Sequence, residues 1–320
     1  MIAVLGAGAF GTALAVAFAR DGKPVVVWAR DPALASQMQA GRENRKRLPG
    51  VAFPDGLRVT GDIDEVRRAD TVLLACPAQS VAGLIQTHSR LFDGKSAVAC
   101  AKGIDLTTGL GTCGVIEKHL PSARAAILSG PSFAADIGRG LPTALTIAAS
   151  SEAASKALQH QLSTKMLRLY RSTDTRGVEF GGALKNVIAI ACGGCIGAGL
   201  GDSARASLIT RGFAEMLRLA TKMGARRETL MGLSGIGDLT LTCTSELSRN
   251  YRLGLALGRG EDIDPSVTVE GVATAQATAH LSQRLGVEMP ICDAVARITD
   301  GRSSVEEAIN GLLLRPLRAE

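Results

Sequence analysis

Three glycines near the N-terminus, Gly6, Gly8 and Gly11, have the spacing of a turn that binds a nucleotide phosphate. A short apolar run, residues 2–5, precedes them, and a helix-forming run, residues 12–19, follows them. In such a strand–turn–helix unit, the first glycine permits the turn, the second lets the backbone approach a pyrophosphate, and the third lets the helix pack on the strand. The pyrophosphate would bind the unpaired N–H groups at the positive end of the helix dipole. The pattern predicts a dinucleotide site, because a βα turn without a ligand explains one glycine easily and three poorly.

A lysine and an asparagine, Lys185 and Asn186, interrupt an otherwise apolar helical stretch over residues 180–196. Small neighbours on the face of the lysine indicate either a tightly packed partner or a bound ligand. Helical spacing gives these neighbours as Gly181, Gly182, Ala189, Cys192 and Gly193. Burial lowers the pKa of a lysine, which can then exchange a proton near neutral pH. The alternative is a lysine whose stem packs while its ammonium reaches water, and this segment by itself does not choose between the two.

A second polar group follows farther along the chain. Asp238 lies in a glycine-rich turn, and Ser248, Arg249 and Asn250 group a hydroxyl, a guanidinium and an amide. The planar fork of arginine suits phosphate recognition. The simpler interpretation is that Asp238 caps a helix and that residues 248–250 are the polar start of another, since Asp, Ser and Asn are good caps.

Arg30 follows an apolar run at residues 24–28, about twenty residues beyond the glycine turn, where an acidic residue would bind the 2′-hydroxyl of NAD and an arginine accommodates the 2′-phosphate of NADP. The residue favours NADP without excluding NAD. A surface arginine at a strand end is the alternative. A basic loop, residues 42–47, comes next and either flanks the adenosine phosphate or is simply solvated.

Apolar runs that alternate with helical stretches indicate a parallel sheet covered on both faces. Besides residues 2–5 these runs are 24–28, 71–77, 97–103, 125–131 and 145–149. Ligands bind such sheets outside the carboxyl ends of the strands. Pro77, Lys102 and Gly130 all fall just past such ends.

The pattern changes near residue 170, where residues 171–175 are polar and typical of a turn. Helical periodicity dominates beyond it, over residues 180–196, 204–223, 251–257 and 274–285. The second half therefore predicts an all-helical domain, and 320 residues are enough for two domains with separate cores.

The net charge of +6 suits either a nucleic-acid binder or an enzyme whose cofactor and substrate are both anionic. The basic residues are spread out, and aromatic residues, which would stack on bases, make up only 3% of the chain. These observations favour the enzyme and argue against a nucleic-acid partner.

The seven cysteines are an odd number without framework spacing, and we expect reduced thiols. Cys192 and Cys195 have C-x-x-C spacing, but the run is apolar and glycine-rich, so close packing is favoured over a metal site. We expect no membrane span, because the apolar runs are shorter than the length needed to cross a bilayer. Met1 begins the first strand directly, which leaves no room for a signal peptide and predicts a cytoplasmic enzyme.

Taken together, these motifs resemble those of bacterial NAD(P)-dependent glycerol-3-phosphate dehydrogenases. The matching segments run in the order of that family over nearly the whole chain. They are GAGAFGTALA at 6–15, AKG at 101–103, LSGPSFA at 128–134, GALKNV at 182–187, GDLTLTC at 237–243, SRN at 248–250 and VEG at 269–271. The last three are far more specific than the glycine turn.

The resemblance implies an α/β Rossmann-like N-terminal domain, residues 1–172, and an all-α C-terminal domain similar to that of 6-phosphogluconate dehydrogenase, residues 173–320. The active site would lie between them. The implied reaction is hydride transfer between the nicotinamide and C2 of dihydroxyacetone phosphate, giving sn-glycerol 3-phosphate for glycerophospholipid synthesis. NADP is the expected cofactor, with NAD also accepted; no metal is required, and the family implies a homodimer.

The resemblance also assigns roles to individual residues. Lys185 would donate the proton to the developing alkoxide and accept it in the reverse direction. The substrate-binding positions are Lys102, Gly130, Ser132, Lys185, Asp238, Ser248, Arg249 and Asn250. The cofactor-binding positions are Gly6, Gly8, Ala9, Phe10, Gly11, Arg30, Arg47, Lys102, Ala134, Arg249 and Glu270.

Three positions depart from the family pattern. Ala9 stands where a serine is frequent, so one hydroxyl contact to the cofactor phosphates is lost. Arg47 replaces a frequent aromatic residue, which either strengthens the hold on a 2′-phosphate or only changes packing. Residues 77–79, Pro-Ala-Gln, differ from the more usual Pro-Ser pattern.

Two other functions are compatible with the same motifs. One is a related β-hydroxyacid or sugar-acid dehydrogenase, which would also use a lysine on a helix; residues 248–250 argue against it. The other is a non-catalytic NADPH-sensing protein, which would need no combination of Lys185 with Asp238.

Overall fold

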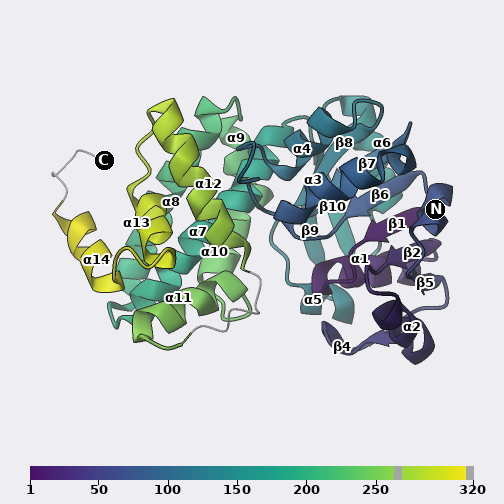
Figure 1. Ribbon diagram of the computed structural model, residues 1–320, viewed down its shortest axis with the longest axis horizontal. Coiled ribbons are helices and arrows are strands. Elements are labelled where there is room, and N and C mark those ends of the chain that lie inside the picture. The colour runs from purple at the N-terminus through teal and green to yellow at the C-terminus, as the bar shows by residue number, and fades with distance from the viewer. Residues whose placement is uncertain (263–268, 315–320) are drawn as a thin grey trace.

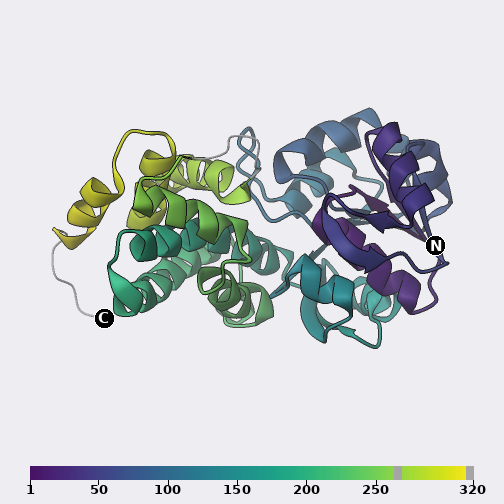
Figure 2. The ribbon, with the colours of Figure 1, turned by 90° about the horizontal axis from the view of Figure 1, so that it is seen from below.

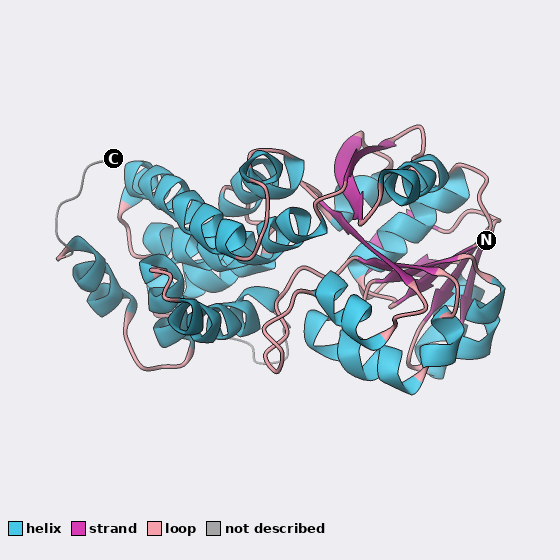
Figure 3. Cartoon of the chain, turned by 90° about the horizontal axis from the view of Figure 1, so that it is seen from above, coloured by secondary structure: helices cyan, strands magenta, loops and turns pink. Residues whose placement is uncertain are grey.

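The computed structural model describes residues 1–262 and 269–314, which form two bodies (Figure 1). Figure 3 shows the strands gathered in the N-terminal body, whereas the described C-terminal residues form helices and their connections. Seen from below, the purple and blue N-terminal half and the green and yellow C-terminal half remain distinct (Figure 2). The expected division at residues 172 and 173 falls between a strand and a helix, and the end of the second expected domain, residues 315–320, lies outside the described residues together with 263–268.

An eight-stranded sheet forms the centre of the N-terminal body, in the order β10-β9-β8-β7-β6-β1-β2-β5. Its strands are β1 (Ile2–Leu5), β2 (Val25–Trp28), β5 (Leu57–Thr60), β6 (Thr71–Leu74), β7 (Ser96–Ala99), β8 (Arg124–Ser129), β9 (Thr143–Ala149) and β10 (Leu167–Ser172). A separate hairpin joins β3 (Glu43–Asn44) to β4 (Leu48–Ala52) within the basic loop.

Neighbouring strands in the sheet are parallel except for β8 and β9, which pair antiparallel. The predicted Rossmann-like fold is confirmed, and the sheet departs from the expected parallel arrangement only at β9 and β10, which run opposite to the other strands. A parallel return needs a crossover along the sheet. The connection at residues 130–142 holds only the short helix α5 (Ala134–Arg139), which packs against α1 (Ala9–Arg20), and the chain re-enters from the edge at which it left.

Strand β10 occupies part of the segment that was expected to be a polar turn. Its side chains alternate, with Leu167 and Leu169 buried and Arg168 and Tyr170 exposed. Such alternation is typical of an edge strand with one solvated face, and it lacks the continuous apolar run that marks the central strands.

Alternate residues of the central strands enter two separate cores. Ile2 and Val4 of β1 belong to the core that contains α1, whereas Ala3 and Leu5 belong to the opposite core. The remaining helices of this body are α2 (Pro32–Gly41), α3 (Ala78–Thr87), α4 (Thr112–His119) and α6 (Glu152–Leu162), with 3-10 turns at Ile63–Arg68 and Ser89–Phe92. Helices α3 and α4 contribute to the second core, so both faces of the sheet are covered as predicted.

Helix α7 (Thr175–Gly197) is the central element of the C-terminal body and contacts most of its helices. Those helices are α8 (Gly201–Lys222), α9 (Arg227–Leu230), α10 (Asp238–Cys243), α11 (Arg249–Arg259), α12 (Glu270–Leu285), α13 (Pro290–Thr299) and α14 (Val305–Leu313). The four expected helices are confirmed as parts of α7, α8, α11 and α12. Helix α7 is long and apolar enough to cross a membrane, which the sequence pattern did not predict, but most of its apolar window is buried inside the protein, as in a core helix.

Glycines allow α7 and α11 to cross at backbone contact. A Cβ atom on Gly193 would lie 2.1 Å from the carbonyl oxygen of Tyr251, and one on Gly254 would lie 2.1 Å from that of Ile190. Cys192 and Cys195 are buried free thiols beside this crossing. Their spacing therefore belongs to close helix packing, as the sequence favoured.

We expect Gly193→Ala to destabilise the protein by about 2 kcal/mol or more, because the added methyl group must push two helix backbones apart. Gly83→Ala is the matched control. Gly83 lies in α3, and a methyl group added there would meet nothing within 4 Å, so alanine should be neutral or stabilise by up to about 1 kcal/mol. Urea denaturation of both variants measures the difference; equal stabilities would contradict the packing argument.

Candidate active site

The residues expected to carry chemistry follow the carboxyl ends of adjacent strands. Gly6 follows β1, Pro77 follows β6, Lys102 follows β7 and Gly130 follows β8. Because these four strands are parallel neighbours, the residues meet at one edge of the sheet. Helix α7 packs against β8 and brings Lys185 toward this edge.

The glycine turn has the geometry that its sequence predicts. Gly6 adopts φ +122°, and a Cβ there would lie 2.6 Å from the carbonyl oxygen of Ala75. A Cβ on Gly11 would lie 2.4 Å from the carbonyl oxygen of Gly6, so this glycine permits close contact between α1 and the turn. Around Gly8 the protein leaves more room, the nearest atom being 4.0 Å from its Cβ position. Protein packing thus requires Gly6 and Gly11, and the open side at Gly8 leaves space for a ligand.

Two lysines share one carboxylate in this site. The Nζ atom of Lys185 lies 2.5 Å from Oδ1 of Asp238, and the Nζ atom of Lys102 lies 2.7 Å from Oδ2 of the same residue. Lys185 also donates to Oγ1 of Thr242 at 2.8 Å, and Lys102 donates to the carbonyl oxygen of Gly130 at 2.9 Å. Asp238 is fully buried and Lys185 nearly so. Of the two interpretations of Lys185, the structure selects the buried lysine with a polar partner.

Local backbone geometry places Asp238 against Lys185. A π-helical turn, Leu233–Gly237, precedes α10, and Asp238 is the first residue of that helix. The turn approaches α7 at Gly181, where a Cβ would lie 2.5 Å from the carbonyl oxygen of Ser234. On the same helix, a Cβ on Gly182 would lie 2.4 Å from Oγ of Ser129. The two glycines therefore let α10 and β8 approach the helix that carries Lys185.

Burial lowers the pKa of Lys185 to about 8, and the positive charge of Lys102 acts in the same direction. The negative charge of Asp238 raises this pKa and partly offsets the burial. The amine thus changes its protonation state near neutral pH, which is the property that a proton donor or acceptor needs.

A chain of amides connects the lysine site to the C-terminal helices. Asn186 donates to the carbonyl oxygen of Lys102 at 3.1 Å, and Asn250 donates to Oδ1 of Asn186 at 3.0 Å. Oδ1 of Asn250 accepts the N–H of Gly271 at 2.9 Å. The chain fixes the Lys102 loop relative to α7, α11 and the start of α12.

The segment at residues 248–250 does begin a helix. Ser248 caps α11, and its Oγ accepts the N–H of Tyr251 at 3.2 Å. Arg249 follows as the first helical residue; surrounding protein lowers its pKa, and the nearby charges of Arg47 and Arg252 lower it further, whereas Glu270 raises it. Helix capping therefore holds for Ser248, and Arg249 lies in the first turn of α11 near the charges of Arg47, Arg252 and Glu270.

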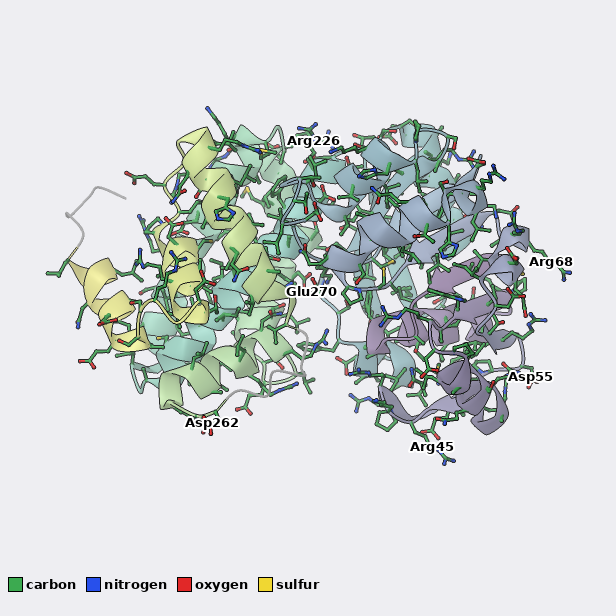
Figure 4. All side chains as sticks on the ribbon, in the orientation of Figure 1. Arg45, Asp55, Arg68, Arg226, Asp262 and Glu270 are labelled. Atoms are coloured by element: carbon green, nitrogen blue, oxygen red, sulfur yellow. The ribbon has the colours of Figure 1, made fainter. Side chains whose placement is uncertain are left out.

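Glu270 links the two bodies, and Figure 4 shows it between them. Its Oε1 accepts the N–H of Ala78 at the start of α3, at 3.2 Å. Burial raises its pKa. A Cβ on Gly103 would lie 3.0 Å from Oε2 of Glu270, so Gly103 leaves room for this carboxylate beside the Lys102 loop.

The other expected site residues lie around this centre. Phe10 in the first turn of α1 lies with its ring 5.8 Å from Nζ of Lys102. Ser132 donates to the carbonyl oxygen of Gly130 at 3.3 Å. Ala9 and Ala134 begin α1 and α5. Arg30 follows β2, and Arg47 lies in the β3–β4 hairpin; both are exposed and outside the lysine cluster.

Sequence reasoning assigned no role to Thr242 and Asn186. Thr242 stands four residues after Asp238, a spacing that puts both on one face of α10. Asn186 was noticed only as a polar residue beside Lys185. The available signal is a polar side chain at helical spacing from a charged one for Thr242, and a polar side chain next to a charged one for Asn186.

Family models for the N-terminus and the C-terminus of NAD-dependent glycerol-3-phosphate dehydrogenase match residues 1–155 and 174–310. The chain belongs to the NAD-dependent glycerol-3-phosphate dehydrogenase family. A member from Ruegeria sp. (strain TM1040), glycerol-3-phosphate dehydrogenase [NAD(P)+], is 58% identical over 319 residues, covering 100% of this chain and 99% of the relative. A relative of the same name from Paracoccus denitrificans (strain Pd 1222) is 57% identical, with the same coverage.

A solved glycerol-3-phosphate dehydrogenase from Coxiella burnetii is also similar to this chain. It is 36% identical, has a TM-score of 0.93 and covers 98% of both chains. The similarity therefore extends over both bodies of the structure.

We expect Asp238→Asn to lower the free energy of unfolding by about 3 kcal/mol, because two neighbouring ammonium groups lose their shared counter-charge in a buried site. Asp136→Asn is the matched control, since Asp136 pairs with Arg139 on the surface and its loss should cost less than about 0.5 kcal/mol. Denaturant unfolding at neutral pH compares the two. Equal losses would show that Asp238 does not stabilise the lysine pair.

Proposed function

We propose that this chain reduces dihydroxyacetone phosphate to sn-glycerol 3-phosphate with NADPH or NADH, and catalyses the reverse oxidation. The observation that carries the proposal is the buried amine of Lys185, whose pKa is lowered to about 8 and which Asp238 and Thr242 hold at the edge of the sheet. The family match and the glycine turn support the same reaction.

The residues present fit a dinucleotide cofactor. The turn at Gly6, Gly8 and Gly11 leaves room for a pyrophosphate at the N-terminus of α1. The further residues proposed to hold the cofactor are Ala9, Phe10, Arg30, Arg47, Lys102, Ala134, Arg249 and Glu270. The bound nicotinamide supplies or accepts the hydride. The names of the relatives include both NAD and NADP, and Arg30 favours NADP.

Lys185 acts on the oxygen at C2 of the substrate. When a hydride reaches the carbonyl carbon, negative charge develops on this oxygen, and a nearby ammonium both stabilises the charge and supplies the proton. Asp238 orients the amine, and its negative charge raises the Lys185 pKa, so that a fraction of the molecules carries a protonated amine despite burial. Lys102, bound to the other carboxylate oxygen, adds positive charge next to the developing alkoxide.

The phosphate of the substrate is proposed to bind farther from the reacting carbon. Ser248, Arg249 and Asn250 at the start of α11, together with Gly130 and Ser132 after β8, are the proposed substrate contacts. Binding energy from a remote phosphate can position the carbonyl group without taking part in bond formation.

The family resemblance also has implications for the cellular setting. We infer a homodimer in the cytoplasm whose product supplies glycerophospholipid synthesis, with residues 1–172 binding the nucleotide and residues 173–320 completing the substrate site.

The direct test of the function is oxidation of NADPH on adding dihydroxyacetone phosphate to folded protein. Absence of turnover with both nicotinamide nucleotides would reject it, and faster turnover of a β-hydroxyacid would favour a related dehydrogenase.

Lys185→Ala should lower kcat by about 10²–10⁴-fold, because the developing alkoxide loses its proton donor. Binding of NADPH, measured by fluorescence titration, should change little. Lys156→Ala, an exposed lysine on α6, is the control and should retain full turnover. Near-normal kcat in Lys185→Ala would remove the proposed proton transfer.

The two directions of the reaction should depend oppositely on pH. Reduction needs the protonated amine, so its rate should fall as the pH rises through the Lys185 pKa of about 8. Oxidation needs the neutral amine, so its rate should rise over the same interval. Initial rates of both reactions between pH 6 and pH 10, a range that brackets the expected transition by about two units on each side, test this. Parallel profiles would contradict the assignment.

Arg30→Ala should weaken NADPH binding by about tenfold and leave NADH binding nearly unchanged, because only NADPH carries the 2′-phosphate. Arg68→Ala is the control, as Arg68 points outward at the far side of the same body (Figure 4). Dissociation constants for both nucleotides provide the measurement. Equal weakening of NADH binding would place Arg30 elsewhere on the cofactor.

A further inference from the structure

One buried side chain, Asn44, connects the β3–β4 hairpin to the glycine turn through hydrogen bonds. Its Nδ2 donates to the carbonyl oxygen of Ala7 at 2.9 Å and to Oγ1 of Thr12 at 2.9 Å. Ala7 lies inside the glycine turn, and Thr12 lies in the first turns of α1. Asn44 and Thr12 are both fully buried, so these hydrogen bonds are shielded from water.

The same side chain also determines where the turn of the hairpin begins. The N–H of Arg47 donates to Oδ1 of Asn44 at 3.2 Å and to its carbonyl oxygen at 3.2 Å. Asn44 thereby uses both ends of its amide, the donor on the glycine turn and the acceptor on the hairpin. The backbone of Arg47 is held in a fixed relation to the turn that is expected to receive a pyrophosphate.

Arg47 approaches a second arginine from the other body of the protein. Its positive charge is close enough to Arg249, at the start of α11, to lower the pKa of that guanidinium. Two nearby cations repel each other, and a phosphate group bound by both would relieve the repulsion. Glu270 lies near Arg249 as well, and its negative charge offsets part of this repulsion, while its Oε1 accepts the N–H of Ala78.

We propose that Asn44 is a positioning residue that holds Arg47 at the glycine turn, so that Arg47, together with Arg249 from the other body, binds one phosphate group of the dinucleotide. This proposal rests on the proposed use of a dinucleotide and not on the identity of the carbonyl substrate. The pyrophosphate and the 2′-phosphate present the same chemistry to two guanidinium groups, and NADH, which lacks the 2′-phosphate, distinguishes them.

The experiment measures the dissociation constants of NADPH and NADH by fluorescence titration, for the full chain and for the variants Asn44→Ala, Arg47→Ala and the double variant. Asn44→Ala should weaken binding by about tenfold, the size expected for the loss of one charged hydrogen bond to phosphate. The double variant should bind nearly as Arg47→Ala does, because Asn44 acts through Arg47. For Asn44→Ala with saturating nucleotide, kcat should stay within about twofold of the parent value while KM for the nucleotide rises.

Arg45→Ala is the matched control. Arg45 stands in the same turn, but it pairs with Glu43 and points outward at the rim of the N-terminal body, so removing its charge should leave both dissociation constants unchanged (Figure 4). Equal weakening of NADPH and NADH in Asn44→Ala assigns the arginines to the pyrophosphate, and weakening of NADPH alone assigns them to the 2′-phosphate. Unchanged binding of both nucleotides, or additive losses in the double variant, overturns the proposal.

Thr12→Val provides a milder test if Asn44→Ala does not fold. It keeps the shape of the side chain and removes Oγ1, one of the two atoms that accept a hydrogen bond from Nδ2 of Asn44. It should therefore weaken binding of the same nucleotides as Arg47→Ala does, and by a smaller factor. The proposal is overturned if Thr12→Val weakens the binding of a nucleotide that Arg47→Ala leaves unaffected. Titration also separates this inference from the proposed reaction, since a parent protein that binds NADPH but reduces no dihydroxyacetone phosphate contradicts only the latter.

Discussion

The architecture of the site depends on one buried carboxylate shared by two ammonium groups. Without Asp238, Lys102 and Lys185 would approach each other as like charges at low dielectric, a situation that favours either deprotonation or separation. With it, both amines stay within hydrogen-bond distance of a single group that holds no exposed surface. The lysines come from different bodies of the protein, so this carboxylate also joins the N-terminal body to the helical body.

Close backbone approach is the structural condition for that arrangement. A lysine side chain in the middle of a helix reaches only a limited distance, and its partners must come to it. Gly181 and Gly182 let the turn before Asp238 and the end of β8 approach α7, and Gly193 lets α11 do the same farther along the helix. The protein is accordingly rich in glycine, with 37, and poor in aromatic residues, at 3%. Larger residues on this face of α7 would separate Lys185 from the groups that set its pKa.

The sequence allowed some of these features to be predicted and concealed others for physical reasons. The glycine turn, the lysine on an apolar helix and the residues after strand ends are local patterns, and the structure brings Lys102, Gly130, Lys185 and Asp238 together. The reversed direction of β9 and the edge strand β10 depend on how the chain re-enters the sheet, which no short pattern encodes. Asn186 and Asn250 gain their partners only through tertiary contacts, and Thr242 meets Lys185 in the same way, so these hydrogen bonds could not be foreseen from residue type.

The pKa of Lys185 shows why the two bodies must be considered together. Burial lowers it, the charge of Lys102 from the N-terminal body lowers it further, and Asp238 raises it. A change in the separation of the bodies alters the Lys102 contribution first, because Asp238 and Lys185 belong to the same body and move together. Since Lys102 is fixed by Gly130, Asn186 and Asp238, and the start of α3 is fixed by Glu270, the proton affinity of the amine depends on contacts that cross between the bodies. The separation of the bodies and the proton affinity of Lys185 are therefore linked in this fold through the electrostatics of three side chains.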